Sequence, residues 1–163
     1  MITIQPFSPE HAAAIGPFVL GIQHEHNVPI TLADQPDLAD IDRAYVNSGG
    51  NFWLALHNGT LVGTIAIINA GNRIGVIRKM FVAPDYRGAP HRVGQKLLDV
   101  LASWARAHTF QTLYLGTLDW FAAARRFYEK NGFALLPEAN LPKEMHGIKM
   151  RLDNTYYAME LAA

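Results

Sequence analysis

The chain has 163 residues, of which half are hydrophobic and 17% are charged. This length is typical of one domain with a substantial core, and the composition excludes a chain that is largely disordered. The 14 basic and 14 acidic residues give a formal net charge of zero, which excludes a global polycation that coats nucleic acid.

The first third of the chain predicts one strand and two helices. Residues 2–7 are the strand candidate. Ser8 and Pro9 indicate the start of a helix that runs to about His24, because serine caps helices and proline is favoured in their first turn. A second helix is expected from Pro36 to about Val46, where a Ser-Gly-Gly sequence follows.

The middle of the chain predicts three strands and a long helix. An Asn-Gly step at 58–59 indicates a tight hairpin turn between strands at 52–57 and 61–69. A third strand is predicted at 75–82. The helix is expected over 92–108, where apolar residues recur at helical spacing: Val93, Leu97, Leu101 and Trp104.

The last third predicts three more strands around one helix. The strands are expected at 112–115, 133–136 and 155–161, and the helix runs from a capping Asp119 to Asn131-Gly132. The whole order is β-α-α-β-β-β-α-β-α-β-β. It predicts a single α/β domain over residues 1–163, with a mixed sheet that has antiparallel and parallel parts.

The zero net charge is a sum of unequal parts. Residues 1–72 hold one basic and six acidic residues, a net charge of −5, whereas residues 73–130 hold ten basic and four acidic residues, a net charge of +6. Residues 131–163 contribute −1. One interpretation is two sites, a basic one for an anion and an acidic one for a cation; the other is solvated surface charge.

The most informative segment is 80–98, where a strand ends, a loop with glycine and arginine turns, and a helix begins. Such a layout directs free backbone N–H groups and the positive end of the helix dipole at one point, which suits a phosphate group. Arg87, Arg92 and Lys96 would add charge-assisted contacts. An ordinary loop with surface arginines is the alternative.

This segment resembles motif A of the GNAT acyl-CoA N-acyltransferase superfamily, Val-x-Pro-x-x-Arg/Gln-x-x-Gly-x-Gly/Ala. Residues 124–133, Ala-Arg-Arg-Phe-Tyr-Glu-Lys-Asn-Gly-Phe, are similar to motif B of that family. Arg-Lys-Met-Phe-Val at 78–82 and Tyr-Leu-Gly-Thr at 114–117 resemble a bacterial branch of it. The resemblance implies the GNAT fold, a mixed central sheet of about seven strands with four helices.

The resemblance also implies an activity and a cosubstrate. It implies an acetyl-CoA-dependent N-acetyltransferase that passes the acetyl group directly from the thioester to a primary amine of a small molecule. Pantetheine would pair with the strand that ends at Val82, the pyrophosphate would bind the following loop, and a backbone N–H near Phe81 or Val82 would face the thioester carbonyl. The residues implied to bind coenzyme A are Met80, Phe81, Val82, Arg87, Gly88, His91, Arg92, Val93, Gly94, Gln95 and Lys96.

Two positions depart from the family pattern. Arg92 stands where the family usually has the first glycine of Gly-x-Gly, and arginine is expected to avoid the positive φ angles that glycine permits. Phe121 stands where the motif B helix usually begins with asparagine. The second change predicts the loss of a polar contact to coenzyme A.

The resemblance implies that Tyr128 is a catalytic residue, since it matches a tyrosine near the coenzyme A sulfur. A phenol can give a proton to the departing thiolate, whereas a tyrosine packed on the sheet is the alternative. The strand at 75–82 offers no carboxylate as a general base. We therefore expect Glu25 or His24 to act as the base, with His26 and a chain of water molecules as the options left open.

Other kinds of chemistry are not expected. The chain has no cysteine, so disulfides, thiolate metal sites and a thioacyl-enzyme intermediate are excluded. His24 and His26 would point to different sides of a helix, so no metal is expected, and the other histidines outside the loop are interpreted as surface or cap residues. Without a secretory signal or an apolar membrane span, we expect a cytoplasmic protein with no nucleic-acid or membrane partner.

Several alternatives stay open. The chain can be a non-catalytic acyl-CoA-binding or sensor module, or an acetyltransferase of protein or peptide amines. A nucleotide binder of another class is disfavoured, because no Gly-Lys-Ser/Thr sequence follows the loop. The fold does not identify the amine acceptor, and a homodimer is one option for the oligomeric state.

Overall fold

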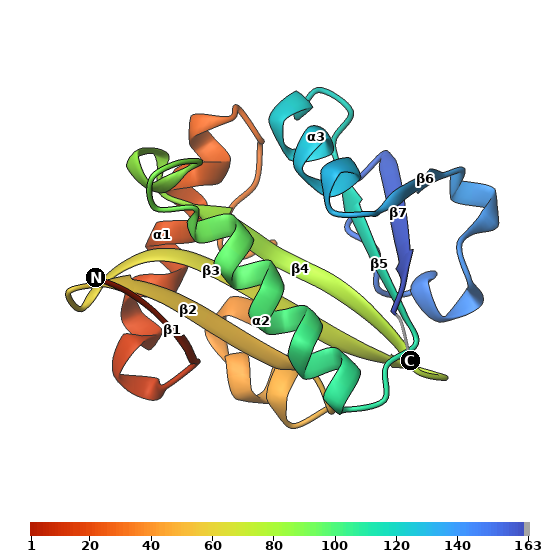
Figure 1. Ribbon diagram of the computed structural model, residues 1–163, viewed down its shortest axis with the longest axis horizontal. Helices are drawn as coiled ribbons and strands as arrows, with labels where there is room; N and C mark the ends of the chain where they lie inside the picture. Colours follow the sequence, from red (N-terminus) through yellow and green to blue (C-terminus); the bar gives the residue numbers. More distant parts are fainter. Residues whose placement is uncertain (162–163) are drawn as a thin grey trace. The chain divides into compact units, whose positions relative to one another are not determined.

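The computed structural model describes residues 1–161, which form a seven-stranded sheet in the order β1-β2-β3-β4-β5-β7-β6 (Figure 1). The strands are β1 (Ile2–Pro6), β2 (Asn51–His57), β3 (Thr60–Gly71), β4 (Ile74–Val82), β5 (Thr112–Thr117), β6 (Ala134–Leu136) and β7 (Thr155–Glu160). The α-helices are α1 (Ala12–Glu25), α2 (Val93–Ala107) and α3 (Ala122–Lys130).

The predicted mixed α/β sheet is confirmed. Strand β2 pairs antiparallel with both β1 and β3, and β7 pairs antiparallel with both β5 and β6. Strands β4 and β5 run parallel, with Ile74 opposite Thr112 and Val76 opposite Tyr114. Two parallel neighbouring strands need a long crossover connection, usually a helix, and α2 provides it between β4 and β5.

The chain forms two compact units. The first unit contains Met1–Ile68 and Arg78–Ser103, and the second contains Asn69–Ile77 and the chain from Trp104 onward. All residues predicted to bind coenzyme A belong to the first unit, as do His24 and Glu25, whereas Tyr128 belongs to the second.

One face of the sheet in the first unit packs against α1 and residues 36–46. Side chains alternate along β2, so Phe52, Leu54 and Leu56 share this face. They form a buried cluster with Ile15, Val19, Ile41, Tyr45 and Ala66. This apolar contact holds α1, whose last residue is Glu25, against the sheet.

The opposite face of β3 receives the first turns of α2, which crosses in front of β2 and β3 in Figure 1. The contact is closest at Gly63, where a Cβ atom would lie 2.9 Å from Cγ1 of Val93 and 3.0 Å from Cδ1 of Leu97. The absence of a side chain at Gly63 therefore lets α2 begin against the sheet. This packing fixes the end of the predicted cofactor loop.

The segment predicted as one helix over 36–46 is helical in two short pieces. Pro36–Ala39 is a 3-10 helix and Asp42–Val46 is a π-helix, separated by Asp40 with a φ of −148° and a ψ of 84°. The hydroxyl of Tyr45 donates a hydrogen bond to Asp37 across this break. Side-chain contacts thus override the helix propensity of the segment.

Of the two predicted helix caps, Ser8 is confirmed in position and Asp119 is wrong. Ser8 stands at the N-cap of the 3-10 turn Pro9–His11 that precedes α1, but its hydroxyl bonds to the side chain of Glu10 at 3.3 Å and makes no capping bond. Helix α3 has Phe121 as its N-cap, while the backbone N–H of Asp119 donates to Oδ1 of Asn154 at 2.9 Å. The hydroxyl of Ser8 thus has another partner, and α3 begins after Phe121 and not after Asp119.

Within residues 1–161, no helix is both long enough and apolar enough to span the hydrocarbon core of a bilayer.

Candidate active site

The predicted coenzyme A residues lie on one continuous strand, loop and helix. Strand β4 ends at Val82, a 3-10 turn occupies Pro84–Tyr86, and α2 begins at Val93. Arg87, Arg92 and Lys96 are exposed along this path. The first N–H groups of an α-helix have no intrahelical acceptor and carry a partial positive charge. The segment therefore offers hydrogen-bond donors and cations together, as a phosphate site requires.

Arg92 contradicts one expectation from the sequence, because its φ is 49°. Its N–H donates to the carbonyl of Gly88 at 2.7 Å, and its own carbonyl accepts from the N–H of Lys96 at 3.1 Å. These bonds hold Arg92 in the left-handed conformation that glycine usually provides, at a cost of about 1–2 kcal/mol for a residue with a side chain. The expectation that arginine avoids this conformation is wrong here.

Arg87 and Glu25 form a bidentate ion pair. Nη1 of Arg87 lies 2.8 Å from Oε2 of Glu25, and Nη2 lies 3.1 Å from Oε1. Nε of Arg87 donates to the carbonyl of Val82 at 2.8 Å. The hydrogen bonds from Arg87, together with its charge, lower the pKa of Glu25. A carboxylate with a lowered pKa is a weaker base, so this geometry disfavours Glu25 as the general base.

His24 has a defined tautomer. Its Nε2 lies 2.9 Å from the carbonyl oxygen of Ile30. Because a carbonyl oxygen can accept but not donate, Nε2 carries the proton and Nδ1 carries the lone pair of the neutral ring. His24 therefore presents Nδ1 as a nitrogen that can accept a proton. In His26 the carbonyl of Ile22 lies 3.0 Å from Nδ1, so there the other nitrogen, Nε2, carries the lone pair of the neutral ring.

His91 belongs to an aromatic cluster that connects the loop to the β2–β3 hairpin. Nδ1 of His57 lies 2.6 Å from the hydroxyl of Tyr86, and the ring centroids of Tyr86 and His91 are 4.8 Å apart. Desolvation lowers the pKa of His57, as do the positive N-terminus and His91. Sequence reasoning missed His57, because 29 residues separate it from Tyr86 and no spacing signal connects them.

A buried lysine in β4 lies directly before Met80–Val82, the residues predicted to pair with pantetheine. The side chain of Lys79 is 3% exposed, and its Nζ lies 2.7 Å from Oε1 of Gln35 and 3.7 Å from Oδ2 of Asp37. The φ of Lys79 is 54°, and its carbonyl accepts from the hydroxyl of Thr64 at 2.7 Å. The conformation of β4 before Met80 therefore depends on contacts that the sequence pattern did not indicate.

Tyr128 lies on α3 in the second unit and is 8% exposed. Its ring packs against Phe133 and Tyr157, at centroid distances of 5.7 and 6.1 Å. Burial raises the pKa of Tyr128, and the charge of Asp153 raises it further. The phenol is thus protonated at neutral pH, as a donor must be, but it is a weaker acid than an ordinary tyrosine.

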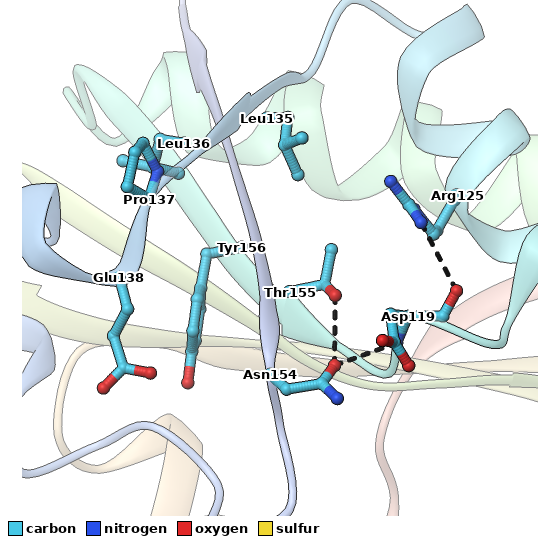
Figure 2. A pocket seen from close by; sticks show the side chains of 9 residues that line it. All are labelled: Asp119, Arg125, Leu135, Leu136, Pro137, Glu138, Asn154, Thr155 and Tyr156. Carbon is cyan, nitrogen blue, oxygen red and sulfur yellow. Dashed lines mark hydrogen bonds between the residues drawn. The ribbon is translucent and has the colours of Figure 1, made fainter.

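The second unit also contains an open cleft, shown in Figure 2. Its polar groups bond to one another: Nη1 of Arg125 donates to the carbonyl of Asp119 at 3.3 Å, and the N–H of Asp119 donates to Asn154. Nε of Arg125 donates to the hydroxyl of Tyr157 at 3.0 Å. Arg125 of motif B thus holds the turn before α3 to β7. Residues of Figure 2 are different from those predicted to bind coenzyme A.

A family model described as acetyltransferase (GNAT) family matches residues 21–133, which include the loop before α2 and Tyr128. The chain belongs to the GNAT family. Membership places it among the acetyltransferases, which are transferases that act on acyl groups.

Two solved structures resemble this GNAT chain over nearly its whole length. An acetyltransferase of the GNAT family from Staphylococcus aureus Mu50 is 37% identical with a TM-score of 0.94, covering 99% of this chain and 100% of that chain. An acetyltransferase from Streptococcus agalactiae 2603 is 31% identical with a TM-score of 0.91, covering 98% of each chain. These similarities confirm the predicted GNAT fold.

Curated relatives match over a shorter part of their length. N-acetylaspartate synthetase of Xenopus tropicalis is 30% identical over 125 residues, which are 71% of this GNAT chain and 45% of that protein. IAA acetyltransferase of Azospirillum brasilense is 37% identical over 84 residues, or 51% of this chain and 54% of that protein. The chain spans about half the length of these curated relatives.

Proposed function

We propose that the chain is an acetyl-CoA-dependent N-acetyltransferase that moves the acetyl group directly to a primary amine of a small molecule within a ternary complex. The observation that carries this proposal is the strand, loop and helix from Met80 to Lys96, which supply helix N–H groups and exposed cations in a GNAT chain. The names of two relatives, N-acetylaspartate synthetase and IAA acetyltransferase, support a small acceptor.

In this proposal the backbone binds most of the cosubstrate. Val93 is fully buried, so it contributes its N–H group to the pyrophosphate and its side chain to the core. Gly94 and Gln95 contribute further N–H groups, and Arg92 and Lys96 contribute charge. The amides of pantetheine pair with the backbone of Met80–Val82, and an N–H group near Phe81 or Val82 stabilises the oxyanion.

Two side chains move protons in this proposal. An amine acceptor with a pKa of about 10.4 must lose a proton, which costs about 4 kcal/mol at pH 7.4. His24 accepts that proton at Nδ1, directly or through water, because its Nε2 is held by the carbonyl of Ile30. Tyr128 gives its phenolic proton, or a hydrogen bond, to the departing thiolate of coenzyme A as the tetrahedral intermediate collapses.

The test is a free-thiol release assay with acetyl-CoA and a panel of amines, amino acids and peptides. We expect thiol release that depends on one class of small amine, and initial rates that give intersecting double-reciprocal plots. Parallel plots would contradict direct transfer, and no release with any amine would contradict the enzymatic activity.

A second candidate is a non-catalytic acyl-CoA-binding module. It is favoured by the absence of a carboxylate between residues 75 and 82 and by the engagement of Glu25 with Arg87. Such a module would bind acetyl-CoA in calorimetry but release no thiol in the presence of amines. The same two measurements therefore separate the two candidates.

A further inference from the structure

Glu25 binds the guanidinium group of Arg87, which lies in the loop predicted to bind coenzyme A. Nη1 and Nη2 both bond to the carboxylate, at 2.8 and 3.1 Å, and Nε bonds to the carbonyl of Val82. A carboxylate and a phosphate take the same bidentate position on a guanidinium. The Nη1–Nη2 edge of Arg87 can therefore hold either Glu25 or a phosphate of coenzyme A at one time.

Charge strengthens this competition. Glu25 neutralises Arg87 and places a negative charge where an anionic ligand is expected. Arg92 and Lys96, the other exposed cations of the loop, attract the same ligand. The carboxylate thus opposes the rest of the site, and its removal leaves a more positive loop.

The ion pair between Arg87 and Glu25 can also break at low cost, so that Arg87 can take another partner. The two side chains are 37% and 38% exposed, and exposed ion pairs contribute little to stability. The bond from Nε to Val82 uses a different N–H group, so Arg87 can keep it while the Nη1–Nη2 edge changes partner. Glu25 has a second neighbour, because Nε2 of His26 lies 3.9 Å from Oε2.

We propose that Glu25 limits the affinity for coenzyme A by competing with a phosphate of the cosubstrate for Arg87, and that binding releases Glu25. This inference rests on the proposed use of coenzyme A. It changes the predicted role of Glu25 from a base to a residue that sets cosubstrate affinity. Glu25 acts through Arg87 and touches no reacting atom.

The test measures coenzyme A binding by calorimetry at fixed salt and pH. The variants are Glu25→Gln, Arg87→Gln, the double variant, and Glu10→Gln as a control that removes the same charge from an exposed position of the first unit. We expect Glu25→Gln to lower the Kd of coenzyme A about two- to fivefold, as the energies of exposed ion pairs imply. We expect Glu10→Gln to leave it within 1.5-fold, an allowance of about 0.2 kcal/mol.

The double variant isolates the pair. With Arg87 replaced by glutamine, the change at Glu25 should tighten binding clearly less than it does with Arg87 present, because no guanidinium remains to be released and only the effect of the removed charge on the rest of the loop is left. An unchanged or higher Kd in Glu25→Gln would overturn the competition, and so would equal tightening by Glu10→Gln. Tighter binding without acetyl transfer would leave the competition standing and contradict only the enzymatic activity; no coenzyme A binding by the wild type would overturn both.

Discussion

The ammonium group of Lys79 lies 2.7 Å from Oε1 of Gln35, and both side chains are buried. Gln35 in turn exchanges two hydrogen bonds of 2.9 Å with the buried Gln23 of α1. A chain of polar contacts therefore connects α1, the segment before Pro36 and strand β4. These contacts hold β4 at Lys79, directly before Met80–Val82, the residues predicted to pair with pantetheine.

Replacing this lysine should destabilise the fold. Lys79→Met would leave Asp37 without its buried cation and would remove one of the two donors to Oε1 of Gln35, and breaking a buried pair typically costs about 3–5 kcal/mol. We expect a loss of about 3 kcal/mol in the free energy of unfolding, measured with urea. The double variant with Asp37→Asn should recover part of this loss, because the unpaired charge is gone. A variant as stable as the wild type would refute the importance of the contact.

A methyl group at Gly63 should be harmful. The Cβ atom of Gly63→Ala would lie 2.9 Å from Val93 and 3.0 Å from Leu97, and overpacking of this kind costs about 1–3 kcal/mol. We expect a lower midpoint of thermal unfolding. The matched control is Gly21→Ala in α1, where nothing lies within 4 Å of the new atom and alanine favours the helix. That variant should be as stable as the wild type or more so; equal effects of the two would contradict the packing argument.

Acid should weaken the fold through His57. Desolvation, the N-terminus and His91 lower the pKa of His57 from its ordinary value of 6.5, so the unfolded chain binds the proton more readily than the folded one. The contribution of His57 is then complete above pH 6.5 and is lost as the pH falls below that value. In urea unfolding at pH 7.5 and pH 5.5, we expect His57→Gln to lose less stability on acidification than the wild type. If His57→Gln loses as much stability between pH 7.5 and pH 5.5 as the wild type does, the loss belongs to other titratable groups.

Tyr128→Phe tests the proposed proton donor. The variant keeps the ring that packs on Phe133 and Tyr157 and removes the hydroxyl. We expect the Kd for acetyl-CoA to stay within about twofold of the wild type and kcat to fall at least tenfold, a threshold below the roughly 10²–10⁴-fold that general acid catalysis typically contributes. An unchanged kcat would leave Tyr128 as a packing residue.

His24→Gln tests the proposed base. A glutamine amide can still donate to the carbonyl of Ile30, as Nε2 of His24 does at 2.9 Å, but it cannot accept a proton near neutral pH. We expect the acidic limb of the pH profile of kcat/KM to disappear or shift. His26→Gln is the control, and Glu25→Gln should leave the limb in place. If His24→Gln and His26→Gln both retain the wild-type profile, water is the better candidate for the base; a limb lost only in His26→Gln would assign the base to His26.

The sequence alone determined the parts of this protein that depend on neighbours along the chain. Strands β2 and β3 and the Asn58-Gly59 turn between them follow from alternation and turn chemistry, and α2 follows from apolar residues at helical spacing. The sequence indicates a phosphate site at residues 87–96, because a glycine, two arginines and the start of a helix lie in this one short segment. These local signals predicted a mixed α/β fold, and the resemblance of residues 80–98 and 124–133 to motifs A and B predicted the family.

Tertiary structure decided the contacts that distant segments make. Glu25 meets Arg87 across 62 residues, and Lys79 meets Gln35 across 44; no local pattern encodes either pair. The positive φ of Arg92 is a local exception, because backbone bonds to Gly88 and Lys96, each four residues away, outweigh the preference of the residue. The packing of α1 and β4 thus brings Glu25 to the cofactor loop, because the free energy of burying whole faces exceeds the local preferences of single residues.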